Sequence, residues 1–521
     1  ESSEIKQPDN FGRNPIHFAC AGGSLSIIRK LDQAHFSLNE KDNEGCLPSH
    51  YAAMAGNLDI FKYLWMKGAD LISASNQYNK MTPLHVASLY GNLNIVKFIC
   101  ETVVGEDETN TNDDKKQLKL MNFAGFHNRY CKFSTPLHLA CEGGHEDILR
   151  YLLTKKELID VQLESLDRSS RTPLLVACKN GSLGCVKALI EYDRNLLKWK
   201  KNRKHVPLID AAGNGYLDIV SFLLKQKEIV IDQINSQKLD AIMTAVRNDR
   251  LNVVKCLVDN GALKKYNDSQ IGELFLSACG SNDINMVKYI DHVADITCFT
   301  KSNNKVAKWT RVGSLKMDEN TEWGTQFMQQ ACMLENEEIV TFLLTKKVPF
   351  EGVDLSMVTS KKWTPFMDFL LKKGYDLSKN TNSSGVPSIV STIKGGSLKN
   401  VKKMIDKGAH LDGEIITEHN CILSACQTAK RDLFDFLMSF NPVIKNGEAC
   451  VERCIYSYGG KNIETRLYMA EQLLKTGSVD VNKSYVSYNN ENLISRAVSI
   501  KSIEFLDLFA KYNADFTKVP M

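Results

Sequence analysis

The chain has 521 residues, too many for one ordinary hydrophobic core, so we expect either several domains or one array of repeats. Hydrophobic residues make up 43% and charged residues 24%, which excludes a mainly disordered chain and a collagen-like chain. The 65 Lys and Arg residues nearly balance the 61 Asp and Glu residues. The resulting net charge of +4 does not favour a dedicated nucleic-acid binder.

The lengths of the apolar runs and the number and spacing of the cysteines indicate the cellular compartment of the chain. No stretch approaches the ~18–20 consecutive apolar residues that cross a bilayer, so we expect no membrane insertion within this chain. The 15 cysteines are odd in number, thinly spread and without a Cys-x-x-Cys pair, unlike those of a disulfide-stapled secreted module. We therefore expect reduced thiols and a cytoplasmic location. Because the chain begins at Glu1 and not Met, we keep open that it is a fragment of a longer protein.

A six-residue motif recurs through the N-terminal part of the chain. Residues 135–140 read Thr-Pro-Leu-His-Leu-Ala, and related copies occupy 14–19, 47–52, 82–87, 172–177 and 206–211. Pro15 and Pro48 are 33 residues apart, and Pro48 and Pro83 are 35 apart. A fixed period of this size indicates a repeat architecture.

Each copy predicts two short helices. A Thr such as Thr135 suits the N-cap, and the following Pro suits the first helical position. A Gly follows the motif's Ala by four residues and predicts a turn, and apolar residues at helical spacing then predict a second helix. One such pair cannot bury its own apolar face, so neighbouring pairs must stack into a solenoid.

The period and the Thr-Pro-Leu-His signature resemble ankyrin repeats, most strongly from about residue 9 to residue 225. Beyond that, alanines such as Ala245, Ala278 and Ala425 keep the frame, and Pro387 opens a copy with Ser391 in the alanine position. We expect an all-α ankyrin-repeat solenoid of about fourteen helix-turn-helix units. Its predicted parts are regular repeats over 1–225, divergent repeats over 226–344 and irregular ankyrin-like repeats over 345–521.

Two connections between repeats are long. The segments at about 101–133 and about 296–324 each add roughly 20 residues to the 33-residue unit, and both follow a second helix. Loops of this length are uncommon unless they are functional or disordered. We expect two finger-loop insertions, either of which could instead fold back over the neighbouring first helices.

Several residues invite a chemical interpretation, but none of the patterns favours catalysis. His17, His50, His85 and His138 recur at helix spacing of ~8–10 Å, too open for one metal ion. The resemblance implies that they are hydrogen-bonding struts. Cysteines that follow the motif's alanine predict small buried residues, and the pair Cys450 and Cys454 is only a weak hint of zinc. Phosphate-loop, nucleophile-elbow and zinc-protease motifs do not occur, so we expect no enzyme and no cofactor.

The resemblance implies a concave recognition face made of fingers and first helices. The candidate partner-binding residues at the ends of first helices are Leu89, Tyr90, Glu142, Lys179, Asn180, Met333 and Leu334. A cationic run contributes Lys198, Trp199, Lys200, Lys201, Arg203 and Lys204, and the second insertion contributes Trp309 and Arg311. The alternative for the run is a solvated turn that aids solubility.

We therefore expect a non-catalytic scaffold that binds other proteins of unknown identity. The Lys- and Asn-rich composition resembles that of protists with AT-rich genomes, whose ankyrin proteins occur in cytoskeletal and ciliary assemblies. Two alternatives stay open: the cytosolic region of a larger membrane protein such as an ion channel, and the regulatory array of an enzyme whose catalytic domain lies outside this chain.

Overall fold

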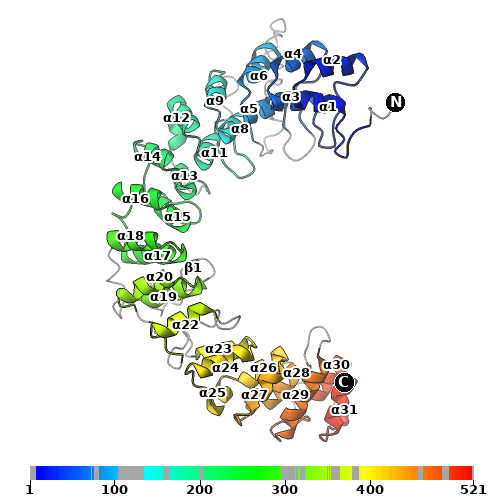
Figure 1. Cartoon of the computed structure of the whole chain (residues 1–521), viewed down its shortest axis with the longest axis vertical. Helices are drawn as coiled ribbons and strands as arrows, with labels where there is room; N and C mark the ends of the chain where they lie inside the picture. The colour runs from blue at the N-terminus through cyan, green and yellow to red at the C-terminus, as the bar shows by residue number, and fades with distance from the viewer. Residues whose placement is uncertain are drawn as a thin grey trace. The chain divides into compact units, whose positions relative to one another are not determined.

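The structure is a computed structural model (Figure 1). It describes residues 7–71, 73–75, 81–103, 134–155, 163–198, 204–294, 311–312, 315–316, 323–348, 350, 353, 364–377, 386–455, 462–483 and 492–518. The chain divides into two compact units, residues 1–267 and residues 268–521. Within these described ranges, no helix has both the length and the apolar character that a bilayer crossing requires.

The first unit is a row of helix pairs in which each first helix packs on the next first helix, and each second helix packs on the next second helix (Figure 1). The first helices are α1 (Pro15–Ala21), α3 (Pro48–Ala55), α5 (Pro83–Tyr90), α8 (Pro136–Gly143), α11 (Pro173–Asn180), α13 (Pro207–Asn214) and α15 (Ala241–Arg247). The second helices are α2 (Leu25–Gln33), α4 (Leu58–Met66), α6 (Leu93–Phe98) with η2 (Ile99–Val103), α9 (Glu146–Leu153), α12 (Leu183–Tyr192) with η3 (Arg194–Leu197), α14 (Leu217–Leu224) and α16 (Leu251–Asp259). Stacked helical pairs of this kind confirm the predicted fold.

The second unit continues with helix pairs, although the sequence motif has faded. The pairs are α17 (Asp268–Gly280) with α18 (Ile284–Ala294), α19 (Trp323–Met333) with α20 (Glu337–Thr345), α23 (Ser388–Lys394) with α24 (Leu398–Asp406), α26 (Cys421–Thr428) with α27 (Arg431–Met438), α28 (Gly447–Ile455) with α29 (Ile463–Lys475), and α30 (Leu493–Ser499) with α31 (Ile503–Ala510). Three further helices are α22 (Pro365–Lys372), α25 (Gly413–Glu418) and the short η5 (Phe516–Lys518). The count of about fourteen units and the three-part division of the chain stay predictions.

The second insertion contains the two-stranded antiparallel hairpin β1 (Arg311–Val312) and β2 (Leu315–Lys316), the described part's only strands. Helix α19 already begins at Trp323, whose buried ring stacks on Phe327 with 5.9 Å between ring centroids. Gly272 of α17 leaves room for this ring, because a Cβ atom there would lie 2.6 Å from it. Trp323 therefore belongs to the apolar core, close to the end predicted for the insertion at about residue 324.

Among the described residues, the turn between the two helices of a repeat contains a residue with left-handed backbone geometry. From α1 to α14 this residue is a glycine, for example Gly56 with φ 76° and Gly91 with φ 82°. In the divergent repeats it lies four residues after Ala245, Ala278, Ala331, Ala425 and Ala497, all buried, and is Asp249, Asn282, Glu335, Ala429 and Lys501. The alanine frame predicted beyond residue 225 therefore matches the backbone even where glycine is missing.

One predicted position in this frame is wrong by one residue. Pro387 is the N-cap of α23 and not its first helical residue, so the helix starts one position later than in the other copies. Thr392, which is fully buried, then takes the alanine position, and Gly396 with φ 74° follows it by four residues. Ser391 is only half-buried. The motif's Pro misled the alignment because Pro is compatible with both positions.

Histidines at equivalent positions join successive repeats. Nε2 of His50 lies 2.9 Å from the carbonyl oxygen of Met81, and Nε2 of His138 lies 3.0 Å from that of Arg171. On the other side of each ring, Nδ1 accepts a hydrogen bond from the backbone N–H of the N-cap, Leu47 or Thr135. Each imidazole thus ties the start of its own helix to the finger of the next repeat, which confirms the predicted struts.

A second set of side chains joins the repeats and was not predicted from the sequence. The residue after the turn glycine reaches back to carbonyl oxygens at the end of the preceding first helix. Asn92 Nδ2 lies 2.7 Å from the oxygen of Ala53, His145 Nε2 lies 2.9 Å from that of Leu89, and Ser182 Oγ donates to that of Cys141. Because the residue type at this position differs between repeats, the sequence shows no recurring motif there. Each side chain nevertheless donates a hydrogen bond to a carbonyl oxygen that has no partner in its own helix.

The first prediction concerns backbone strain. Ala429 adopts φ 51° and ψ 42°, a conformation that costs an L-residue roughly 1–2 kcal/mol and glycine little. We expect Ala429→Gly to raise the free energy of unfolding by about 1 kcal/mol, measured by urea denaturation. As the control, Ala425→Gly in the buried helix should lower it. A destabilised Ala429→Gly variant would contradict the assigned turn.

The second prediction concerns acid stability. Burial lowers the pKa of His138 to about 4, so the folded protein keeps this imidazole neutral where the unfolded chain, with a pKa of ~6.5, binds a proton. The contribution of neutral His138 to the free energy of unfolding is therefore fully present above pH ~6.5 and is lost as the pH falls towards 4. At pH ~5 the loss amounts to ~2 kcal/mol.

We expect His138→Leu, which copies Leu175 of the next repeat, to lower stability at neutral pH by ~1 kcal/mol through the lost hydrogen bond. The same variant should lose less stability than the wild type on acidification. Urea midpoints across this pH range measure both effects, with exposed His35→Gln as the control. Parallel pH curves for wild type and His138→Leu would rule out the neutral strut.

Candidate functional site

The histidine ladder has no coordination site for a metal ion. In His50 and His138, Nδ1 already accepts a backbone N–H and Nε2–H already donates to a carbonyl oxygen. A metal needs an unused nitrogen lone pair, and neither ring offers one. Among the residues that the structure describes, no three His, Cys, Asp or Glu side chains group in a way that could hold a metal.

Most of the described cysteines are buried in the core. Those that follow the motif's alanine are buried, as predicted: Cys20, Cys141, Cys178, Cys279, Cys332 and Cys426. Burial raises the pKa of the Cys20 thiol to about 12, so the thiol stays protonated and unreactive at neutral pH. Cys450 and Cys454 are buried free thiols too, and burial likewise raises the pKa of Cys450 to about 12.

A pocket of about 300 Å³ lies where the ends of two first helices meet a finger. Leu89 of α5 and Leu139 and Glu142 of α8 line it together with the finger residues Asp167 and Arg171. It combines apolar side chains with charged ones, which suits recognition of another molecule's side chains. First-helix ends and fingers therefore share one surface here, as the resemblance implied.

The finger that borders this pocket is built by a short polar turn. Asp167 Oδ1 accepts hydrogen bonds from the backbone N–H groups of Ser169 and Arg171, each at 2.8 Å. Its second carboxylate oxygen pairs with the guanidinium of Arg171 at 2.6 Å, and the contact is largely shielded from water. Asn235 builds the same turn in a later finger through its Oδ1. These turns hold the fingers in a fixed shape that the sequence pattern alone did not predict.

The predicted first-helix candidates differ in how accessible they are. Tyr90 is 53% exposed and Leu334 is 39% exposed. Leu89 and Met333, which precede them in the chain, are half-buried and therefore less accessible to a partner. Glu142, Lys179 and Asn180 are exposed. Whether any of them binds a partner stays a prediction.

Only part of the cationic run and of the second insertion can be located. Lys198 and Lys204 are exposed at the two sides of the finger between α12 and α13. Arg311 lies in strand β1. Trp199, Lys200, Lys201, Arg203 and Trp309 lie outside the described residues.

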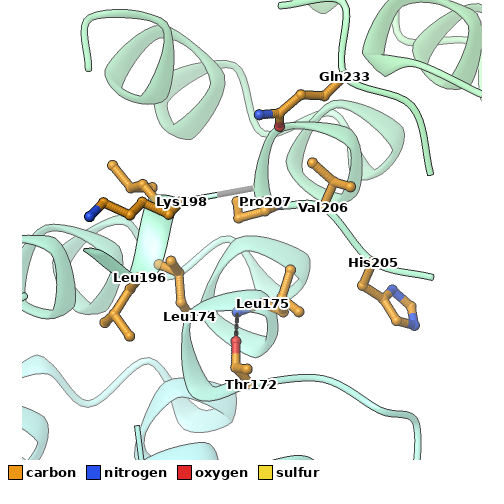
Figure 2. Close-up of a pocket in the computed structure, with 10 residues that line it drawn as sticks. Thr172, Leu174, Leu175, Leu196, Lys198, His205, Val206, Pro207 and Gln233 are labelled. Atoms are coloured by element: carbon orange, nitrogen blue, oxygen red, sulfur yellow. Dashed lines mark hydrogen bonds between the residues drawn. The ribbon is translucent and has the colours of Figure 1, made fainter. Parts of the chain in front are cut away.

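A much smaller cavity, of about 30 Å³, lies beneath Lys198 (Figure 2). It is lined by Leu174, Leu196, Pro207 and Gln233 among others, and Gln233 extends towards it from the next finger (Figure 2). This volume has room for only a few water molecules and is too small for an organic cofactor. This part of the surface is therefore suited to contacts from outside and not to enclosing a ligand.

Comparison with known proteins agrees with the fold. Overlapping matches to the family model for ankyrin repeats (three copies) run from residue 1 to residue 269, about half of the chain. The ankyrin repeat and KH domain-containing protein mask-1 of Caenorhabditis elegans is 27% identical over 192 residues, which are 30% of this chain and 7% of that protein. The human transient receptor potential cation channel subfamily A member 1 is 26% identical over 135 residues, covering 24% of this chain and 12% of the channel.

A solved structure, the human ASB11 ankyrin repeat domain, aligns over 48% of this chain and 98% of its own length, with 21% identity and a TM-score of 0.36. The chain thus spans about a tenth of the length of the curated relatives described above. The repeat motif, the stacked helical pairs and the family-model match agree: the chain belongs to the ankyrin-repeat family, whose repeats are protein–protein interaction modules.

Proposed function

We propose that this chain is a non-catalytic scaffold that binds partner proteins through the ends of its first helices and its finger loops. The observation that carries the proposal is the pocket of about 300 Å³, where first-helix residues such as Leu89 and Glu142 line one hollow with the Asp167 finger. A hollow with apolar walls and charged groups suits side chains projecting from a partner. Exposed Tyr90, at the end of helix α5, is of a type enriched at protein interfaces.

Some charges on the second-helix face already pair with one another, which makes those parts of the face weaker binding surfaces. Arg150 bonds Glu146 of its own helix and Glu191 of the neighbouring one at 2.7 and 3.0 Å. Lys67 pairs with Asp32 of the preceding repeat at 3.0 Å. Pairs that connect repeats contribute to stacking, and a partner would have to break them. We therefore assign partner binding to the opposite face.

The finer role that we propose is that of a structural component of a larger assembly in the cytoplasm, of cytoskeletal or ciliary type. A second candidate is the cytosolic ankyrin region of a larger membrane protein. The resemblance to the human channel over 24% of this chain favours it, and the complete gene product would then contain apolar spans. A regulatory array of an enzyme would instead predict a further globular domain in that product.

The test is cross-linking mass spectrometry of the protein in native extract. We expect cross-links to a neighbouring protein from lysines of the first-helix and finger surface, such as Lys179, Lys198 and Lys204. Lys62 and Lys97, which are exposed on second helices, serve as the internal control. Cross-links to partners from the second-helix lysines alone would contradict the choice of surface.

A further inference from the structure

The cations of the first unit are concentrated in its later repeats. Residues 168–265 contain 18 Lys and Arg against 9 Asp and Glu, an excess of nine positive charges. The whole chain has an excess of only four, so the remaining residues together carry a net negative charge. An excess of this kind within about a hundred residues sets up a local positive potential that attracts anionic partners.

Five of these cations occupy the surface formed by first-helix ends and fingers. Lys179 of α11 and Arg247 of α15 stand two residues after the buried register alanine, the position that Glu142 holds at the pocket in α8. Lys198 and Lys204 flank one finger, and Lys238 lies in the polar turn of the next finger. We call these five residues the cationic surface.

The residues of the cationic surface have no anionic partner within the protein's described part. All five are exposed, and none of their side chains makes a hydrogen bond or ion pair with another described residue. On the second helices of the same unit, Arg150 and Lys67 pair with carboxylates of their own or of neighbouring helices, whereas the exposed Arg29, Lys30 and Lys62 form no ion pair with a described residue. A local excess of unpaired charge of one sign is complementary to a ligand of the opposite sign.

Exposed apolar side chains lie on the finger of Lys238 and on the finger that precedes α11. Leu166 and Ile234 each directly precede the residue that builds the finger turn, Asp167 or Asn235, and they are 39% and 48% exposed. Exposed aliphatic groups beside cations suit a partner that presents both carboxylates and apolar side chains. The phosphate backbone of a nucleic acid offers charge but no aliphatic side chains. The apolar pair therefore favours a protein partner.

We propose that the cationic surface, Lys179, Lys198, Lys204, Lys238 and Arg247, binds an acidic protein segment whose apolar side chains contact Leu166 and Ile234. The inference rests on the proposed protein-binding function and specifies the chemistry of the partner. Carboxylates accept hydrogen bonds from Lys and Arg, and the neighbouring apolar contacts make the interaction less dependent on charge alone.

The test uses fluorescence anisotropy with labelled peptides and the full chain. The probes are a peptide of repeated Glu-Glu-Leu-Gly units, its Gln-Gln-Leu-Gly and Glu-Glu-Ser-Gly analogues, and a single-stranded oligonucleotide of equal charge. We expect the Glu-Glu-Leu-Gly peptide to bind more tightly than the three other probes. Its affinity should fall as salt is added, because exposed charges are screened.

The variant that tests the surface combines Lys179→Gln, Lys198→Gln, Lys204→Gln, Lys238→Gln and Arg247→Gln. Its matched control removes the same number of charges from exposed second-helix positions, with Arg29→Gln, Lys30→Gln, Lys62→Gln, Lys97→Gln and Lys187→Gln. The surface variant should bind the acidic peptide about tenfold more weakly or worse, and the control within about twofold of the wild type. Far-UV circular dichroism checks that both variants fold.

Three results would overturn the inference: equal affinities of the two variants, tighter binding of the oligonucleotide than of the peptide, or equal binding of the Gln-Gln-Leu-Gly analogue. Each leaves the scaffold function standing if cross-links from first-helix and finger lysines to a protein are still found. Absence of any such protein cross-link would instead reject the scaffold function itself.

Discussion

The structure depends on the burial of apolar helix faces that no single repeat can bury alone. Each helix pair is only two or three turns per helix, and helices this short are marginal in water without tertiary packing. Buried alanines such as Ala52 and Ala211 let first helices approach closely, and the aliphatic stripes of second helices pack on the neighbouring pair. Stability therefore arises between repeats, and the histidine struts and carbonyl-capping side chains keep those repeats in register.

The parts of the fold that could be predicted are those with a fixed backbone requirement. The motif requires Pro at the first helical position, a small buried residue and a left-handed turn. It can be recognised in the sequence because few residue types suit each of these positions. The same reasoning worked beyond residue 225 through the alanines alone, although Asp249 and Glu335 replace glycine at the turn. It failed at Pro387, because Pro is compatible with both the N-cap and the first helical position. It also failed at Trp323, a core residue at the start of a helix that the sequence pattern placed in an insertion.

The candidate surface was harder to predict than the fold. The sequence indicated the first-helix positions, Arg247 among them, and the run around Lys198, but it gave no reason to group them with Lys238. That grouping depends on where the fingers project and on which charges are already paired, both of which are properties of the stacked structure. Ion pairs such as Arg150 with Glu191 join repeats on the second helices, and the cations of the cationic surface stay available to a partner.

Hydrogen–deuterium exchange followed by mass spectrometry tests the central claim most directly, because backbone amides are protected from exchange only where helices are formed and packed. The account predicts that helices α17 to α31 of the second unit exchange slowly, comparably to helices α1 to α16 of the first, although only the first carries the motif. Exchange throughout residues 268–518 at the rate of an unfolded peptide, beside slow exchange in the first unit, would contradict stacking of repeats along the chain.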